Sequence, residues 1–207
     1  EQNKIQILIG TQMIAKGLDF PHLTVVGLLL ADVGFHIPDF RANERSFQLI
    51  TQVAGRAGRH SHTPGEVLIQ TFSPHQPSIE FSVANDYAGF ANYELAQRQS
   101  LNYPPFGRVA TIRTIHSQLH MAEKSAQLIK QHLFALKNHR SIYKIIDILG
   151  PAPAPLTKLR NKYRYHILLK SPKPNILQPF ASEVLVHSNS LTSGTKVQID
   201  LDPYHLL

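Results

Sequence analysis

The chain has 207 residues, of which 43% are hydrophobic and 17% charged, so it can bury the core of one large domain or two modest ones. It contains no apolar run of about 18 residues that would span a membrane and no N-terminal signal-peptide pattern. We therefore expect a cytoplasmic protein with no membrane partner. The absence of cysteine excludes thiolate sites, and the twelve histidines show no metal-binding spacing, so we expect no metal site.

Positive charge is concentrated in the second half of the chain. Residues 1–99 contain 7 Lys and Arg against 9 Asp and Glu, a net charge of −2, whereas residues 100–207 contain 14 against 5, a net charge of +9. The two halves add up to the formal charge of +7. Such asymmetry indicates a nucleic-acid partner or an acidic protein partner for the second half.

The first half has the pattern of an α/β unit. Apolar runs at residues 5–10 and 23–31 predict strands buried on both faces of a mainly parallel sheet, and residues 66–71 predict another strand. A helical period begins at Asp39, with Phe47, Ile50 and Val53 or Ala54 on its apolar stripe. Residues 78–100 predict one or two further helices. Because the chain opens on Glu1 without a methionine and enters an apolar run almost at once, we expect a fragment.

The second half alternates strands and helices regularly. The pattern predicts strands at 108–116, 144–149, 163–170 and 196–201, helices at 119–138 and about 175–188, and a proline-rich loop at 150–155. This βαββαβ order is that of an α+β ferredoxin-like sandwich, in which two helices cover one antiparallel sheet. The Pro104–Pro105 step excludes helix, so we divide the chain into residues 1–75, a helical connector 76–102 and a C-terminal domain 103–207.

The sequence QVAGRAGR carries two arginines beside two glycines. Gln52, Arg56 and Arg59 are spaced i, i+4 and i+7, which predicts that they share one face of a helix. Gly55 and Gly58 each cost about 1 kcal/mol relative to alanine inside a helix, so we interpret them as positions of close backbone approach to a neighbour or ligand. A guanidinium pair suits phosphate. The alternative is a helix frayed at its C-terminus, where cations also favour the helix dipole.

A second candidate site, GTQMIAKGLDFP at residues 10–21, directly follows a predicted buried strand. Ligands in open α/β sheets bind beyond the carboxyl ends of strands. Thr11 and Gln12 would begin a short helical turn, Gly17 would end it, and Asp19 would face the same crevice. The alternative is purely structural, with Gly17 only a cap and Asp19 only a turn former before Pro21.

Together these segments resemble motifs V and VI of superfamily-two helicases, which belong to the second RecA-like lobe. The longer stretch through ADVGFHIPDFRANERSFQLITQVAGRAGR resembles the PriA family of replication-restart helicases. The resemblance continues through YPPFGR at 103–108, the GPAPAP loop, KYRYHILLK at 162–170 and IDLDP at 199–203, and so covers essentially the whole chain. Related helicases such as RecG share motif VI but would not be expected to carry this C-terminal unit.

The resemblance implies roles for individual residues and for cofactors. Arg56 and Arg59 would act as catalytic arginine fingers on the ATP γ-phosphate. The ATP-binding and coupling residues would be Gly10, Thr11, Gln12, Lys16, Gly17, Asp19, Gln52, Gly55 and Gly58. ATP and Mg²⁺ would serve the full-length protein, and Zn²⁺ would bind an upstream segment absent from this chain. Because the chain has no GxxxxGK[ST] loop and no DExH motif, we expect it to be inactive as an ATPase alone.

The strongest electrostatic feature lies between Asp147 and Glu183, where no acidic residue occurs. Residues 158–164 also alternate, so an extended segment would show cations on one face and Leu159, Tyr163 and Tyr165 on the other. Cations interleaved with tyrosines suit single-stranded or branched DNA; the alternative is a solvated strand whose tyrosines are core. We take as DNA-binding candidates Lys158, Arg160, Lys162, Arg164, Lys170 and Lys173.

We therefore expect the C-terminal part of an ATP-dependent 3′–5′ DNA helicase that recognises stalled replication forks and restarts replication by primosome assembly. The resemblance implies association with the nucleoid, and as partners forked and single-stranded DNA, single-stranded DNA-binding protein and primosome loading proteins. Charge alone does not separate DNA from the acidic tail of the partner protein. Tyr103 and Phe106 are expected to be an interdomain packing element. The alternative function is a non-enzymatic nucleic-acid or protein adapter with a degenerate helicase lobe.

Overall fold

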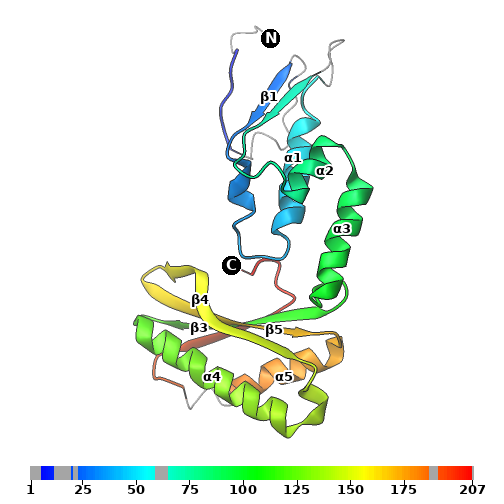
Figure 1. Cartoon of the computed structure of the whole chain (residues 1–207). Helices are drawn as coiled ribbons and strands as arrows, with labels where there is room; N and C mark the ends of the chain where they lie inside the picture. The colour runs from blue at the N-terminus through cyan, green and yellow to red at the C-terminus, as the bar shows by residue number, and fades with distance from the viewer. Residues whose placement is uncertain (1–5, 12–19, 21–22, 59–64, 187–190, 207) are drawn as a thin grey trace. The chain divides into compact units, whose positions relative to one another are not determined.

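The chain folds as two compact units (Figure 1). The computed structural model describes residues 6–11, 20, 23–58, 65–186 and 191–206. The first unit comprises residues 1–37 and 41–94, and the second, which we call the tail unit, comprises residues 38–40 and 95–207. The tail unit therefore includes a three-residue segment that lies far upstream of the rest of it in the sequence.

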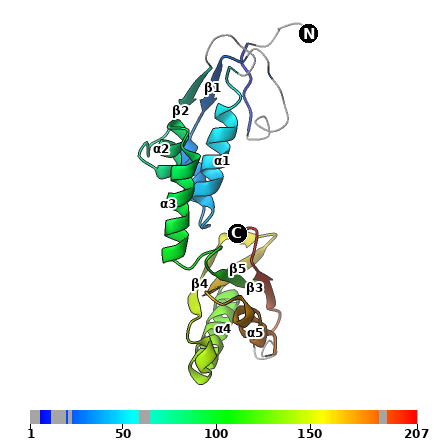
Figure 2. The ribbon, with the colours of Figure 1, turned by 90° about the vertical axis from the view of Figure 1, so that its right-hand side faces the viewer.

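The first unit is mixed α/β (Figure 2). Strand β1 (Val25–Leu28) pairs in parallel with β2 (Glu66–Ile69). A short 3₁₀ helix, η1 (Ala31–Gly34), and helix α1 (Ala42–Ala54) lie between these strands in the sequence. Helix α2 (Pro77–Val83) and helix α3 (Tyr87–Ser100) follow, and α3 continues into the tail unit.

The apolar stripe of α1 forms the core of the first unit. Phe47, Ile50 and Val53 are buried, as the sequence predicted. The Phe47 ring stacks on Phe90 of α3, with centroids 4.2 Å apart and planes 3° from parallel. Within η1, the buried Asp32 carboxylate accepts hydrogen bonds from the Thr71 hydroxyl and the Phe72 amide, which ties η1 to the chain after β2. The burial of α1 therefore organises the first unit.

One strand prediction for this unit is wrong, and a second is confirmed only in part. Residues 6–11 form no strand, and Ile7 and Ile9 are 79% and 87% exposed. Strand β1 forms within the predicted range 23–31, but its residues alternate between exposed and half-buried, whereas the apolar run predicted burial on both faces. A doubly buried strand needs hydrogen-bonded neighbours and cover on both sides. In the described part of the first unit, the sheet has only these two strands.

The tail unit is built on a four-stranded antiparallel sheet in the order β4-β5-β3-β6. Its elements follow the predicted order, and β3 and β6 have the predicted bounds. The strands are β3 (Arg108–His116), β4 (Asp147–Leu159), β5 (Lys162–Ser171) and β6 (Lys196–Leu201). The helices are α4 (Leu119–His139), the 3₁₀ helix η2 (Ser141–Tyr143) and α5 (Pro174–Val186).

Helices α4 and α5 cover one face of this sheet (Figure 1). Ile112 of β3 and Ile167 of β5 point into the core that Leu133 of α4 and Phe180 of α5 complete. Because successive strand residues point to opposite faces, the alternate positions form a second face, opposite α4 and α5, which we call the helix-free face. The helix-free face carries residues 111, 113 and 115 of β3, 164, 166, 168 and 170 of β5, and 196, 198 and 200 of β6.

The proline-rich segment is not the predicted loop. Residues 150–155 lie within β4, which pairs with β5 on both sides of two irregularities, between Leu149 and Ala152 and between Pro153 and Lys158. β4 is an edge strand, so its proline nitrogens need not donate a hydrogen bond on the outer side. The two irregularities shift the register of β4 against β5 where regular pairing is interrupted. Prolines at such an edge stop the sheet from adding another strand there.

Gly150→Ala tests how β4 is accommodated. Gly150 has a φ of +101°, and an added Cβ would lie 2.9 Å from the His166 carbonyl oxygen. We expect this substitution to lower the free energy of unfolding by about 1–3 kcal/mol, measured by urea denaturation, because a side chain is strained in that backbone conformation. Gly27→Ala in β1 is the control, since a Cβ added there would have no atom within 4 Å. Equal losses of stability in the two variants would show that the conformation of Gly150 does not specifically require glycine.

Candidate nucleic-acid interface

A tight turn joins β4 to β5 and gathers three cations. Arg160 and Asn161 have φ values of +50° and +59°, and the strands pair up to Leu159 and Lys162 on either side of them. Positive φ at both central residues is what a two-residue hairpin turn needs to match the strand twist. We call the exposed cations at this turn the basic tip: Lys158, Arg160 and Lys162.

The turn corrects the prediction of one extended, alternating segment over 158–164. The chain reverses within that segment, so the alternation does not carry across it. The sequence signal was Asn161, since asparagine tolerates positive φ better than other non-glycine residues. Tyr165, by contrast, is buried against Ala122 and Ala126 of α4, and Tyr163 packs on the same cluster, so both tyrosines belong to the core.

The Lys158 ammonium lies 5.1 Å from the centre of the Tyr163 ring. The cation therefore rests on the outer part of this core cluster while the residue stays exposed. Such support limits the motion of the tip without neutralising its charge.

Arg164 and Lys170 are engaged within the tail unit. The Arg164 guanidinium donates to the Leu156 carbonyl oxygen from Nε at 2.8 Å and from Nη2 at 2.5 Å, across the irregular part of β4. Lys170 is only 7% exposed, and its Nζ donates to the Leu101 carbonyl oxygen at 2.8 Å and lies 3.7 Å from Asp147 Oδ2. Both cations therefore hold backbone or side-chain oxygens of their own unit.

Lys173 lies in the exposed link between β5 and α5, at the far end of β5 from the basic tip. A strand rises about 3.3 Å per residue, so the two positions are roughly 30 Å apart. The six cations that run together in the sequence are thus divided among a tip, two internally bonded side chains and one remote lysine.

The Lys170 ammonium also closes a stack of side chains. It lies 4.8 Å from the centre of the Tyr103 ring, and Phe40 stacks on Tyr103 with centroids 4.6 Å apart. The Arg98 guanidinium in turn lies 5.1 Å from the centre of the Phe40 ring. The Tyr103 ring is therefore occupied on both faces, which makes it a packing residue, and its partners all lie in the tail unit. Phe106 remains 39% exposed.

In the first unit, the predicted arginine face does not form as a helix face. α1 ends at Ala54, and Arg56 follows in a tighter turn in which its amide donates to the Val53 carbonyl oxygen at 3.0 Å. Gly55 has a φ of −66°, and a Cβ added there would make only ordinary van der Waals contacts, with the Thr51 carbonyl oxygen at 3.5 Å. Gly58 has a φ of +68°, and its amide donates to Leu23 O at 2.9 Å, so only the second glycine is required by the backbone.

The remaining first-unit candidates are placed as follows. Gln52 is exposed on α1, and Gly10 and Thr11 lie in exposed irregular backbone. The other candidates lie outside the described residues: Gln12, Lys16, Gly17, Asp19 and Arg59. The turn 55–58 therefore carries the described part of the predicted phosphate site, with Arg56 as its cation.

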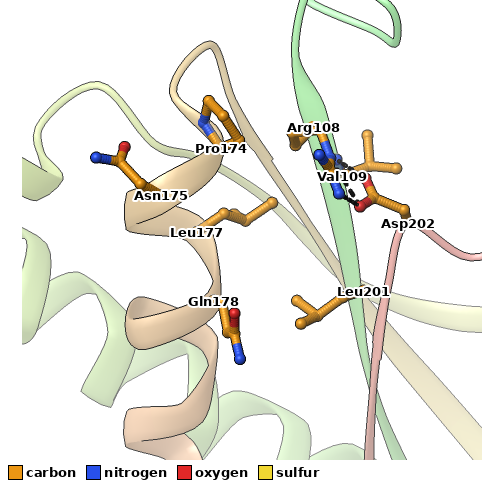
Figure 3. A pocket seen from close by; sticks show the side chains of 8 residues that line it. All are labelled: Arg108, Val109, Pro174, Asn175, Leu177, Gln178, Leu201 and Asp202. Atoms are coloured by element: carbon orange, nitrogen blue, oxygen red, sulfur yellow. Dashed lines mark hydrogen bonds and ion pairs between the residues drawn. The ribbon is translucent and has the colours of Figure 1, made fainter.

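A small pocket of about 320 Å³ lies between the start of β3, the end of β6 and the first turn of α5 (Figure 3). Val109, Leu177 and Leu201 supply apolar lining, and Arg108 forms an ion pair with Asp202 at its edge, with Nε donating to Oδ2 at 2.7 Å. This hydrogen bond and the carboxylate charge raise the pKa of Arg108. The pair joins two segments singled out in the sequence, YPPFGR and IDLDP, and fixes the end of β6 on β3.

Within the ranges that the structure describes, no helix is long and apolar enough to cross a membrane. In the same residues, no three His, Asp or Glu side chains are grouped so that they could hold a metal ion.

These features define a mixed α/β protein with an antiparallel α+β tail unit that exposes a basic hairpin tip. Residues 99–204 match the family model for the primosomal protein N C-terminal domain, which is 106 of the 207 residues. The chain therefore belongs to the PriA family of replication restart proteins and corresponds to a C-terminal part of its members.

Named relatives agree with this assignment. The chain is 40% identical over 208 residues to the replication restart protein PriA of Bacillus subtilis, covering 100% of this chain and 25% of that protein. It is 39% identical to the Haemophilus influenzae protein of the same name, covering 100% of this chain and 27% of the relative. The chain thus spans about a quarter of the length of these relatives. A solved structure, the de novo designed protein Foldit4, covers 48% of the chain at a TM-score of 0.35 and 15% identity, too low for any argument.

Lys170→Ala and Lys162→Ala separate a structural lysine from an exposed one. We expect Lys170→Ala to lower the free energy of unfolding by about 1–3 kcal/mol, because it removes a charged donor from the Leu101 carbonyl oxygen and a cation from the Tyr103 ring. Lys162→Ala, at the basic tip, should change it by less than about 0.5 kcal/mol. Urea denaturation measures both. A neutral Lys170→Ala would show that the stack does not stabilise the tail unit.

Proposed function

We propose that the chain is the C-terminal part of an ATP-dependent 3′–5′ DNA helicase that restarts replication at stalled forks, and that its basic tip binds DNA phosphates. The observation that carries the DNA-binding proposal is the tip itself: three exposed cations held on one tight turn in the half of the chain with a net charge of +9. Lys and Arg bind backbone phosphates without regard to base sequence. Such contacts suit a protein that must engage forks of any sequence.

We propose the finer fold classes on the observed topology. The strand order β4-β5-β3-β6, with α4 and α5 on one face, supports a ferredoxin-like sandwich for the tail unit. The parallel pairing of β1 and β2 through a crossover that contains α1 supports a RecA-like lobe for the first unit.

We assign Arg56 to the ATP γ-phosphate in the complete helicase, with Arg59 beside it. A positioned arginine stabilises the charge that develops in phosphoryl transfer. The positive φ of Gly58 and its bond to Leu23 O hold the turn against the start of β1, which supports a fixed position for Arg56. ATP and Mg²⁺ would be bound chiefly by parts of the protein outside this chain, as would Zn²⁺.

The protein partners follow from the same charge. The acidic tail of single-stranded DNA-binding protein would be attracted by the cations that bind DNA, and primosome loading proteins would assemble on the resulting complex. Competition between an acidic peptide and DNA therefore reports whether the two ligands share the basic tip.

The DNA-binding proposal is tested by removing the charge of the tip. Fluorescence anisotropy of the 207-residue chain with forked and single-stranded DNA, across a salt series, should show binding that weakens steeply with salt. The combined variant Lys158→Gln, Arg160→Gln, Lys162→Gln should bind roughly tenfold or more weakly and lower the salt slope by about 2–3, since each lost phosphate contact removes about one from that slope.

The matched control removes the same charge elsewhere. The control is the combined variant Lys124→Gln, Lys130→Gln, Lys144→Gln. Lys124 and Lys130 lie on α4 and Lys144 directly follows η2, on the helical side of the tail unit. This variant should bind DNA nearly as the unmodified chain does. Equal losses in the two variants would mean that net charge alone attracts DNA, and unchanged binding by the tip variant would refute the assignment.

The arginine assignment predicts a separate effect on catalysis. In a full-length protein that carries this chain, Arg56→Ala should lower DNA-stimulated ATP hydrolysis by about 10³-fold, the range for loss of an arginine finger, and leave fork binding unchanged. A coupled ATPase assay and anisotropy on the same preparation measure the two properties. Retained hydrolysis would make Arg56 a structural residue of the turn.

A further inference from the structure

Two arginines and a histidine gather on the helix-free face beside the basic tip. Arg113 of β3 lies directly opposite His166 of β5, and Ile115 lies opposite Arg164. Directly opposed residues on one face of an antiparallel sheet are side-chain neighbours, and diagonal ones lie within reach of long side chains. We call Arg113, Arg164 and His166 the cationic patch. On the same strand and face, two residues before Arg164, Lys162 connects it to the tip.

The patch has hydrogen-bonding groups that lack partners. Arg113 Nε and His166 Nδ1 are both shielded from solvent without a hydrogen bond, and they belong to directly opposed residues of one face. Once His166 is protonated, both atoms are donors. An oxygen that accepts from both would satisfy two buried groups at once, and an anionic oxygen would do so with charge-assisted bonds.

The charges around His166 favour an anion as that acceptor. Burial lowers the pKa of His166, and the charge of Arg113 lowers it further; burial and Arg113 likewise lower the pKa of Arg164. Among the described residues, no carboxylate forms an ion pair with any of the three. Like charges held together in this way repel one another until a counter-charge arrives.

The charged groups on the other elements around His166 do not cancel the positive charge of the two arginines. On β4, His166 is opposed by Ala152, and the Asp147 carboxylate on that strand lies beside Lys170. On β6, the helix-free face carries Lys196 and Asp200 on either side of Gln198, which is opposite Arg113. After β6, the His205 carbonyl oxygen accepts from Arg113 Nη2 at 3.5 Å.

We propose that the cationic patch binds a backbone phosphate of single-stranded nucleic acid that runs from the basic tip along β5, and that His166 takes up a proton when the phosphate binds. This inference rests on the proposed DNA-binding function and adds Arg113 and His166 to its interface. Alternate residues of β5 are about 6.6 Å apart, so Lys162, Arg164 and His166 form a row whose spacing suits successive phosphates of an extended strand. Arg164 contributes its positive charge to this row while its Nε and Nη2 stay on the Leu156 carbonyl oxygen. A row of this kind favours a polymer over an isolated anion.

The sign of the pH dependence follows from the charges. His166 is neutral in the free chain above its lowered pKa, and a bound phosphate stabilises the protonated ring, so affinity should rise as pH falls. Anisotropy with an oligothymidylate of about twelve nucleotides, at constant ionic strength, should show binding roughly tenfold tighter near pH 5.5 than near pH 8, the gain from a hydrogen bond to a charged group.

Variants assign the effect to the patch. His166→Gln should bind with little pH dependence, and Arg113→Gln should bind more weakly at every pH, whereas Arg113→Lys, which keeps the charge, should retain most of the affinity. His120→Gln is the control, because His120 is exposed on α4 on the helical side. It should keep the full pH dependence. A His166→Gln variant that keeps it as well would overturn the proposal.

A measurement on the unmodified chain avoids any loss of folding in the variants. NMR titration of the His166 ring should show its pKa rising when the oligothymidylate is added, and rising much less with inorganic phosphate at the same phosphate concentration. An unchanged His166 titration with DNA bound would overturn the inference. A rise with inorganic phosphate alone would assign the patch to a small anion and overturn the nucleic-acid part.

The two proposals fail in different ways. If the unmodified chain binds DNA, loses binding with the basic-tip variant and shows no pH dependence, the cationic patch is excluded and the DNA-binding function stands. If the unmodified chain does not bind DNA at low salt at either pH, the proposed function fails, and this inference fails with it.

Discussion

The antiparallel pairing of β3 with β5 is the constraint on which the rest of the tail unit depends. Nine consecutive residue pairs join these two central strands, from Arg108–Ser171 to His116–Tyr163. This register places Ile112 and Ile167 together under the helices and Arg113 and His166 together on the opposite face. Because side chains alternate along a strand, a slip by one residue would place the cations in the core. The hydrophobic core therefore fixes the position of the cationic face.

The same pairing explains why neighbouring cations in the sequence have different roles. Lys170 is opposite Val109 near one end of β5, where Tyr103 and the Leu101 carbonyl oxygen surround its ammonium. Lys162 lies at the other end, at the turn, where it is exposed. A count of charges along the sequence treats the two lysines alike. The structure distinguishes them, because the Lys170 ammonium is held by Tyr103 and the Leu101 carbonyl oxygen, whereas Lys162 is exposed and can bind phosphate.

The regular elements of the tail unit could be predicted because their sequence patterns are strong. β6 alternates over most of its length, β3 is rich in Val, Ile and Thr, and α4 presents an apolar stripe, so their positions followed from the sequence. The proline-rich segment was misassigned because proline excludes a central strand but not an edge strand, and the edge position of β4 depends on the order of the strands. Of the two apolar runs in the first unit, residues 6–11 form no strand and the run at 23–31 forms β1 without burial on both faces. Apolar composition alone does not supply the neighbouring strands and the cover that a doubly buried strand needs.

The candidate sites were predictable by residue type more than by geometry. The spacing of Gln52, Arg56 and Arg59 assumed a continuous helix, but α1 ends at Ala54 and the chain continues as a turn in which Gly58 has a positive φ. Arg113 and His166 lie 53 positions apart in the sequence and meet only through strand pairing, so no local motif marks them together. The alternation of Lys162, Arg164 and His166 was the one sequence signal for this face, and it depends on the strand beginning after the turn at Asn161.

The central claim is that nucleic acid binds the tip and helix-free face of the tail unit. The most direct measurement is a backbone amide chemical-shift map of the isotopically labelled chain titrated with a short oligothymidylate. We expect the shifts to concentrate in residues 158–166 and at Arg113, with α4 and α5 unaffected. Shifts concentrated on α4 and α5, or none in residues 158–166 at saturating DNA, would contradict this claim.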